Sequence, residues 1–133
     1  MKNSIICEIG YLPSPHLNQI YKGFELLEKQ KIISKLIVQP VTGDMLKPLL
    51  TVTLNKKIRI IYDTLDGLNW ISGNKEENLH HFQQNINADF YFKRSYKPIL
   101  QDFSPTGCKV FPLGLNYNIT HNLKNKGLSD VRN

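Results

Sequence analysis

The sequence predicts a single α/β domain of the doubly wound type, with a mostly parallel sheet between helices. Three observations predict this class. Short apolar runs alternate with stretches of helical periodicity. The length of 133 residues suits one domain, and the 41% of hydrophobic residues can form a core. Two β-prone runs between residues 49 and 63 add an antiparallel hairpin.

The first elements are expected to be a strand, a helix and a strand. An apolar run predicts a buried strand over residues 4–10. Ser14 is a favourable N-cap and Pro15 a favourable first helical residue. The apolar residues that follow recur at helical spacing, so we expect an amphipathic helix over 15–31. A second strand is expected over 35–41.

The hairpin over residues 49–63 follows a turn with a little helix over 42–47. After a polar loop, Asn74 and Glu77 have the spacing of a capping box, which predicts a helix over 75–86. Strands are then expected over 88–92 and 109–113, separated by a loop or short helix. The domain is expected to occupy residues 1–118, and residues 119–133 a polar tail or truncated linker.

Composition excludes several classes of protein. The two cysteines, Cys7 and Cys108, have no CxxC spacing, so neither a disulfide framework nor a zinc site is expected. Cys7 lies in an apolar run and is expected to be a buried thiol, in a reducing, cytoplasmic setting. The N-terminal apolar run is too short for a signal peptide. The net charge of +6 favours anionic partners, although a basic domain without a polyanion partner is equally compatible.

Four polar loops follow the expected strands directly, at residues 10–16, 63–67, 93–96 and 114–118. In open α/β sheets, ligands bind at the carboxyl ends of the strands. Each loop taken alone is better interpreted as an ordinary turn. Four of them at one edge of a sheet indicate a binding cleft.

His16 is the candidate catalytic residue. It lies in the first turn of the expected helix, where a neutral imidazole could take a proton from a hydroxyl nucleophile. The alternative is an exposed histidine at a helix start. The other three histidines lack metal-ligand spacing, and no metal is expected.

The two central loops carry charge. The paired carboxylates Asp63 and Asp66 could bind a metal or share acid–base work, but their spacing more often stabilises a turn. Asp66 and Gly67 could instead bind sugar hydroxyls or fix the loop. Lys93 and Arg94 follow an aromatic strand and suit a phosphate or carboxylate, with Ser95 as an additional donor. The alternative is a solvated basic loop. Nucleic acid is not the favoured partner, because the aromatic run has the pattern of a buried strand.

Three segments, IRIIYDTLDG, ADFYFKRSY and KVFPLGLNYN, occur in this order within residues 56–118. They resemble the N-terminal domain of bacterial glycosyltransferases of the GT-B architecture, which are associated with capsule and lipopolysaccharide assembly. The resemblance implies a Rossmann-like domain that binds a saccharide or lipid-linked acceptor, without an essential metal or other cofactor. It implies that a separate C-terminal domain binds the nucleotide-sugar.

The residues expected to bind the acceptor are the polar, glycine and proline residues of the four loops: Pro13, Ser14, Asp63, Asp66, Gly67, Lys93, Arg94, Ser95 and Asn116. No donor-site motif follows, so we expect this chain to be the N-terminal half of such an enzyme, incomplete in isolation. A cytoplasmic location with peripheral contact at the inner membrane surface is expected. The alternative function is a non-enzymatic basic module that binds phosphorylated ligands or RNA.

Overall fold

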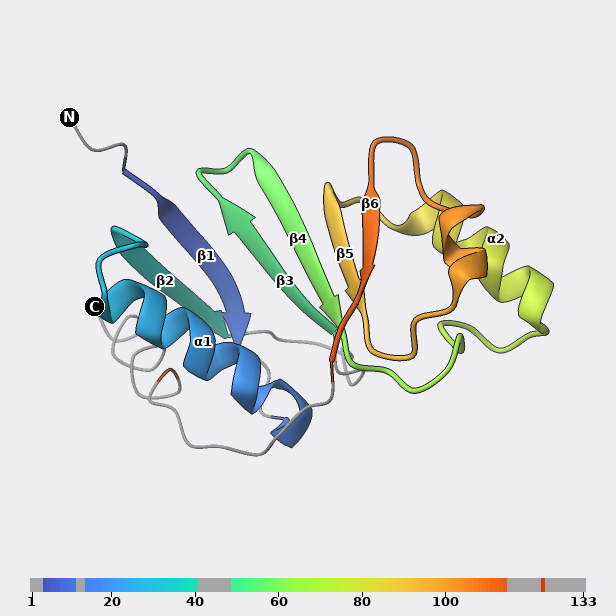
Figure 1. Ribbon diagram of the computed structural model, residues 1–133, viewed down its shortest axis with the longest axis horizontal. Coiled ribbons are helices and arrows are strands. Elements are labelled where there is room, and N and C mark those ends of the chain that lie inside the picture. Colours follow the sequence, from blue (N-terminus) through green and yellow to red (C-terminus); the bar gives the residue numbers. More distant parts are fainter. Residues whose placement is uncertain (1–3, 12–13, 41–48, 115–122, 124–133) are drawn as a thin grey trace.

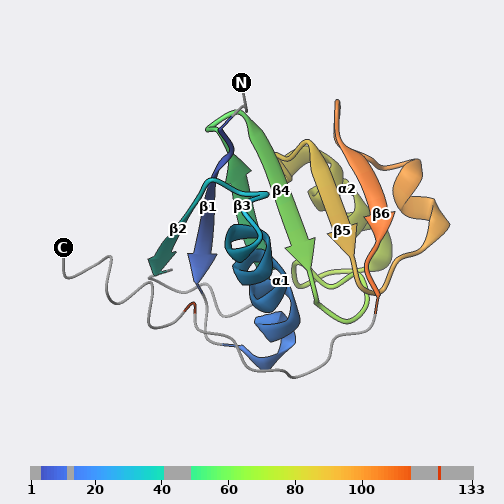
Figure 2. The same cartoon turned by 60° about the vertical axis from the view of Figure 1, so that its left-hand side comes forward.

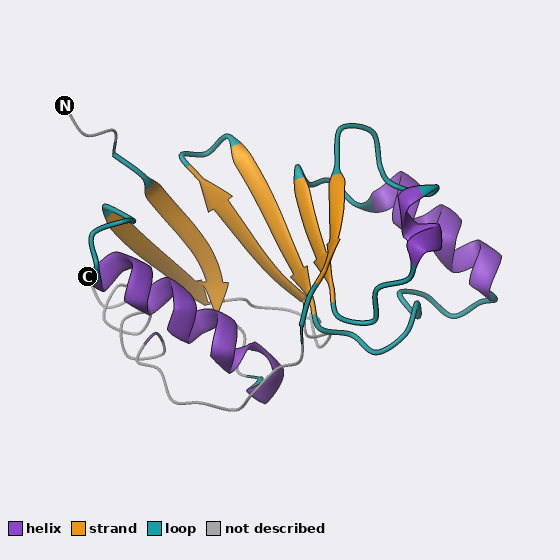
Figure 3. Ribbon diagram, viewed as in Figure 1, coloured by secondary structure: helices purple, strands orange, loops and turns teal. Residues whose placement is uncertain are grey.

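The computed structural model describes residues 4–11, 14–40, 49–114 and Leu123. They form a six-stranded sheet and two α-helices (Figures 1 and 3). The elements are β1 (Ile6–Tyr11), α1 (Asn18–Lys29), β2 (Lys35–Pro40), β3 (Leu49–Leu54), β4 (Ile58–Asp63), α2 (Lys75–Asn85), β5 (Phe90–Lys93) and β6 (Lys109–Pro112), with short 3-10 helices at Pro15–Leu17 and Pro98–Gln101.

The sheet has the strand order β2-β1-β3-β4-β5-β6. Strand β3 is antiparallel to both of its neighbours, β1 and β4, whereas the β1–β2, β4–β5 and β5–β6 pairs are parallel. The predicted α/β class, with a mostly parallel sheet and one hairpin, is therefore confirmed. All strands except β3 end at the same edge, which we call the carboxyl edge; it lies at the bottom of Figure 1.

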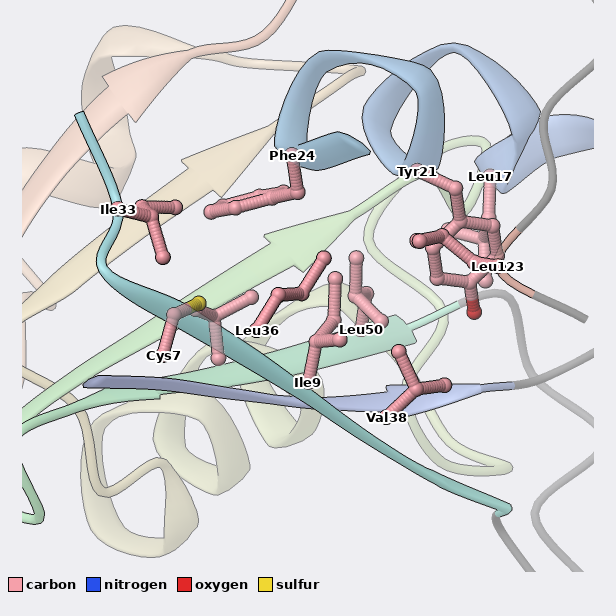
Figure 4. Close-up of a cluster of buried hydrophobic side chains, with 11 residues drawn as sticks. Cys7, Ile9, Leu17, Tyr21, Phe24, Ile33, Leu36, Val38, Leu50 and Leu123 are labelled. Carbon is pink, nitrogen blue, oxygen red and sulfur yellow. The ribbon is translucent and has the colours of Figure 1, made fainter. Parts of the chain in front are cut away.

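The two helices cover opposite faces of the sheet (Figures 1 and 2). Alternation along β4 shows this directly: Ile60 and Tyr62 pack with the α1 side, whereas Ile61 packs with the α2 side. The α1 cluster fills the space over β1, β2 and β3 (Figure 4). The α2 cluster joins Trp70, Phe82 and other apolar residues to β4, β5 and β6.

Local sequence signals account for the helix starts. The Ser14 hydroxyl accepts a hydrogen bond from the His16 amide (3.3 Å), and the chain passes through one 3-10 turn before α1. At α2 the capping box is confirmed, because Asn74 and Glu77 each accept from the other's amide (2.8 and 3.1 Å). Both helices end within two residues of the predicted positions.

Strand boundaries shift by one or two residues from those predicted. Strand β5 begins at Phe90 instead of Ala88, because Asp89 exchanges hydrogen bonds with the Arg59 backbone and precedes the ladder. The hairpin turn has positive φ angles at Asn55 (51°) and Lys56 (57°), a conformation that asparagine tolerates well. The turn expected over 42–47 lies outside the described residues.

Leu123 is buried within the α1 cluster, with 1% of its surface exposed. Figure 4 draws it beside Leu17 and Tyr21. It belongs to the segment expected to be a polar tail or linker, of which the other residues lie outside the described part of the chain. At least this one side chain of the segment is part of the core.

Cys7 is a buried free thiol, as predicted. Burial, with smaller effects from Glu8 and Glu28, raises the pKa of Cys7 from 9.0 to about 12. A pKa that is raised in the folded state stabilises the fold fully below the unfolded value, and this contribution is lost as the pH rises through the folded value. We therefore expect the free energy of unfolding to fall between pH 9 and 12.

The contribution of Cys7 to that slope is at most about 1.4 kcal/mol per pH unit. Urea denaturation of the wild type and of Cys7→Ala at several pH values would isolate it. The variant is expected to be less stable at neutral pH but to show the shallower alkaline slope. Parallel slopes in the two proteins would contradict this assignment.

Candidate functional site

Asp63 and Lys93 end two neighbouring parallel strands, β4 and β5, and are paired in register. Since side chains alternate between the two faces of a sheet, both point to the side of α2. Both side chains are completely buried, and Lys93 Nζ lies 3.4 Å from Asp63 Oδ1. The two residues therefore form a buried ion pair at the carboxyl edge.

Four donors converge on the Asp63 carboxylate. The amide of Leu65 (2.8 Å) and the Lys93 ammonium donate to Oδ1. The Trp70 indole N–H (2.9 Å) and the Tyr91 hydroxyl donate to Oδ2. Burial, followed by the Asp63 charge, raises the pKa of Tyr91, so this hydroxyl stays protonated and remains a donor. The carboxylate is thereby fully engaged by the protein itself.

Lys93 connects the same network to the loop after β4. Its Nζ donates to the carbonyl oxygen of Leu65 (2.5 Å) and lies 5.8 Å from the centre of the Trp70 ring. Burial lowers the pKa of Lys93 from 10.5, while Asp63 acts in the opposite direction. Both backbone polar groups of Leu65 are thus held from the end of the sheet, which fixes the start of the loop over residues 64–73.

A second ion pair at this edge joins half-buried Arg94 to exposed Asp66. Arg94 Nε is 3.7 Å from Asp66 Oδ1, and the Asp66 side chain is 84% exposed. A pair in which one partner is largely exposed contributes little to stability. Gly67 follows with φ of 70°, where a β-carbon would lie 3.0 Å from the Asn69 amide nitrogen. This turn therefore favours glycine, because a side chain here would have a strained φ and would displace the Asn69 side chain.

A cavity of about 240 Å³ opens beside Gly67. Its lining comes from the loop after β4, the start of α2 and the loop after β5: Gly67, Leu68, Asn69, Gly73, Lys75, Asn78 and Lys97. Asn78 is buried and holds the wall together, accepting from the Ile71 amide (2.9 Å) and donating to the carbonyls of Gly73 and Asn74. Lys75 and Lys97 are exposed cations on the lining.

The predicted site residues divide into two groups along the carboxyl edge. The structure brings together Asp63, Asp66, Gly67, Lys93 and Arg94 at the ends of β4 and β5, with half-buried Ser95 next in sequence. Ser14 and exposed His16 follow β1 instead. Strand β3 separates β1 from β4, so about two strand spacings of 4.8 Å lie between the groups. Pro13 and Asn116 lie outside the described residues.

Asp63 and Lys93 are at the predicted place but face inward, so neither side chain reaches the surface. The alternation of side chains along each strand accounts for this, because each is the last residue of a strand whose alternate residues face α2. The sequence reading missed Trp70, Tyr91 and the lining residues Lys75 and Lys97. Lys97 directly follows the loop over 93–96, whereas Lys75 lies eight residues beyond the loop over 63–67.

Among the described residues, no group of three or more His, Cys, Asp or Glu side chains could hold a metal ion. The helices in the described part of the chain are too short or too polar to cross a membrane. No protein-family model matches the chain, and neither a curated protein nor a solved structure matches it.

Proposed function

We propose that this chain is a Rossmann-like, acceptor-side domain of a glycosyltransferase, and that it binds a phosphorylated saccharide in the cavity beside Gly67. The observation that carries the proposal is the position of the cavity. Loops after two neighbouring parallel strands line it together with the start of α2. Open α/β sheets bind ligands at this edge.

The size and charge of the cavity set the ligand class. Small-molecule sites commonly have about 300–1,000 Å³, so about 240 Å³ suits one sugar-sized unit. Lys75 and Lys97 favour an anionic group. Glu77, which lies at the same helix start, already binds the Asn74 amide. Asn69 and the backbone at Gly67 and Gly73 are suited to hydroxyl groups.

The sugar chemistry rests on the resemblance of the three segments to glycosyltransferases, whereas the anionic group rests on the two lysines. A catalytic role for His16 stays a prediction. Its imidazole would meet the acceptor only if the ligand extended from the end of β4, past β3, to the end of β1. The donor sugar nucleotide would be bound by a second domain.

Titration with glucose 1-phosphate, glucose and inorganic phosphate, followed by amide shifts in NMR spectra, tests the proposal. The sugar phosphate is expected to bind most tightly and to shift Gly67, Gly73 and Lys75. The Lys75→Gln/Lys97→Gln variant is expected to bind it at least about tenfold more weakly, because two charge-assisted contacts are lost.

The matched control is Lys29→Gln/Lys35→Gln, which removes the same charge from exposed lysines near α1 and β2. Equal weakening by both variants would mean that net charge alone attracts the ligand, and would overturn the site. If inorganic phosphate binds as tightly as the sugar phosphate, the alternative of a non-enzymatic phosphate-binding module is favoured, because the same two lysines serve it.

A further inference from the structure

Strands β4, β5 and β6 carry a row of aromatic rings on the α1 side of the sheet, which we call the aromatic face. The register places Tyr62, Phe92 and Phe111 side by side on this face, because paired residues of neighbouring strands point to the same side. The ring centres lie 5.1 and 5.5 Å apart, with angles of 12° and 27° between the ring planes. Phe111 is 40% exposed. By alternation along the strands, the other apolar residues of this face are Ile58, Ile60 and Phe90.

Among the described residues, no helix covers β5 and β6 on the aromatic face. Helix α1 lies over β1, β2 and β3, and α2 lies behind β5 and β6 on the opposite face (Figure 2). Parallel strands are ordinarily buried by helices on both faces. The opposite face over β1 and β3 also has no helix, but it carries polar residues, Glu8, Thr51 and Thr53, among its apolar ones. The aromatic half is therefore the one whose composition indicates a cover.

A groove of about 310 Å³ lies between α1 and β4, at the border of the aromatic face. It is lined by Ile20, Gly23, Phe24, Leu27 and Tyr62. Gly23 lies inside α1, where glycine is less favourable than alanine, and a β-carbon there would meet nothing within 4 Å. Packing within the described residues does not account for this glycine. A second helix beside α1 would account for it, because glycine permits a close approach.

We propose that the aromatic face binds an amphipathic helix of a separate protein, which carries acidic residues beside its apolar stripe. A helix is about 10–12 Å wide, and three strands spaced about 4.8 Å apart offer a matching width beside α1. The charge of the partner follows from the amino end of these strands, where Lys57 and Lys109 are exposed. Asp89, at the same end, already accepts from the Arg59 amide (2.9 Å). This inference does not depend on the proposed function.

Two other modes of recognition fit this part of the sheet less well. Strand addition at β6 is hindered, because Gln101 Nε2 already donates to the Val110 carbonyl (2.8 Å) and Pro112 has no amide hydrogen. Stacking of nucleic-acid bases requires exposed ring faces. The rings of the row are nearly parallel and face one another, so they present mainly their edges to the outside. The aliphatic side chains of a helix need no exposed ring face.

Two designed peptides of about 18 residues, or about five helical turns, test the inference. Both carry leucines at helical spacing, and one has glutamates beside the leucines where the other has lysines. The lysine peptide is expected to bind roughly tenfold more weakly than the glutamate peptide, because Lys57 and Lys109 repel it. The ring signals of Tyr62 and Phe111 and the amide of Gly23 are expected to shift in NMR spectra. Failure of the glutamate peptide to bind would overturn the inference.

Variants test each part of the surface. Lys57→Glu/Lys109→Glu is expected to reverse the preference between the two peptides. Phe111→Ser is expected to weaken the glutamate peptide at least about tenfold. Ile6→Ser is the matched control, since Ile6 is 39% exposed and lies on the opposite face, and it is expected to leave the affinity unchanged.

Gly23→Ala keeps the inference testable if Phe111→Ser does not fold. It is expected to raise the midpoint of thermal unfolding, because alanine favours α1 and its β-carbon meets nothing. The same variant is expected to weaken the glutamate peptide several-fold, because the added methyl group obstructs the approach of a helix. A Gly23→Ala variant that binds as tightly as the wild type would contradict the placement of the helix beside α1.

Three further results would overturn the inference. Equal weakening by Phe111→Ser and Ile6→Ser would mean that the peptide binds apolar surface without a specific site. A wild-type dimer in sedimentation equilibrium that Phe111→Ser makes monomeric would show that a second copy of the chain covers the aromatic face. A single-stranded oligothymidylate that shifts the same rings and displaces the peptide would show a nucleic-acid surface instead.

Discussion

Replacing Asp63 with alanine is expected to lower the free energy of unfolding by about 3–5 kcal/mol, as for other buried ion pairs that lose one partner. The carboxylate accepts from the Leu65 amide, the Trp70 indole, the Tyr91 hydroxyl and the Lys93 ammonium. Alanine removes the acceptor that a buried cation and three other donors share, and it leaves the Lys93 charge without its counter-charge. Because a domain has only about 5–15 kcal/mol in total, this variant is expected to be near the unfolding threshold.

Lys93→Met provides the sharper comparison. Removing the Lys93 ammonium leaves the Asp63 carboxylate with three donors, so the loss of stability is expected to be smaller than for Asp63→Ala. Asp102→Ala, at an exposed aspartate, is expected to stay within about 0.5 kcal/mol of the wild type. Urea denaturation at neutral pH measures all three. If Lys93→Met lowers the free energy of unfolding as much as Asp63→Ala or more, the ion pair stabilises the fold more than the other donors to Asp63 do.

This network also explains what the sequence could and could not predict about the site. Helical spacing, the hairpin and the capping box at Asn74 are local signals, and each produced the expected element. The edge position of the site followed from the order of strands and helices. The inward orientation of Asp63 and Lys93 was missed, although alternation along β4 and β5 places them on the same face as Ile61 and Tyr91.

The residues that line the cavity also divide into one that local sequence signals predict and others that they do not. Gly67 was predicted because it lies in the polar loop that follows β4, which is a local signal. Lys75 and Lys97 lie 8 and 30 residues further along the chain. They approach Gly67 only because α2 packs under the loops that follow β4 and β5. Neither the spacing of these residues in the sequence nor the pattern of charges predicts that packing.

Leu123→Ala is expected to lower the free energy of unfolding by about 2–5 kcal/mol, the usual range for a buried leucine. The segment from residue 119 onward looks dispensable by composition, since large apolar residues are few. Leu123 nevertheless packs in the α1 cluster, which also contains Leu17, Tyr21 and Val38. Leu26→Ala is the matched control, because Leu26 is 39% exposed on α1, and it is expected to cost less than about 1 kcal/mol.

A double-mutant cycle shows whether the effect arises at this contact. Leu17 and Leu123 belong to one cluster, so Leu17→Ala and Leu123→Ala are expected to be non-additive by roughly 0.5–3 kcal/mol, because residues that share a cavity couple. Additive losses, or a loss for Leu123→Ala no larger than for Leu26→Ala, would place Leu123 outside the core. The expected coupling instead means that the folded domain extends at least to Leu123, since a side chain stabilises only the unit against which it packs.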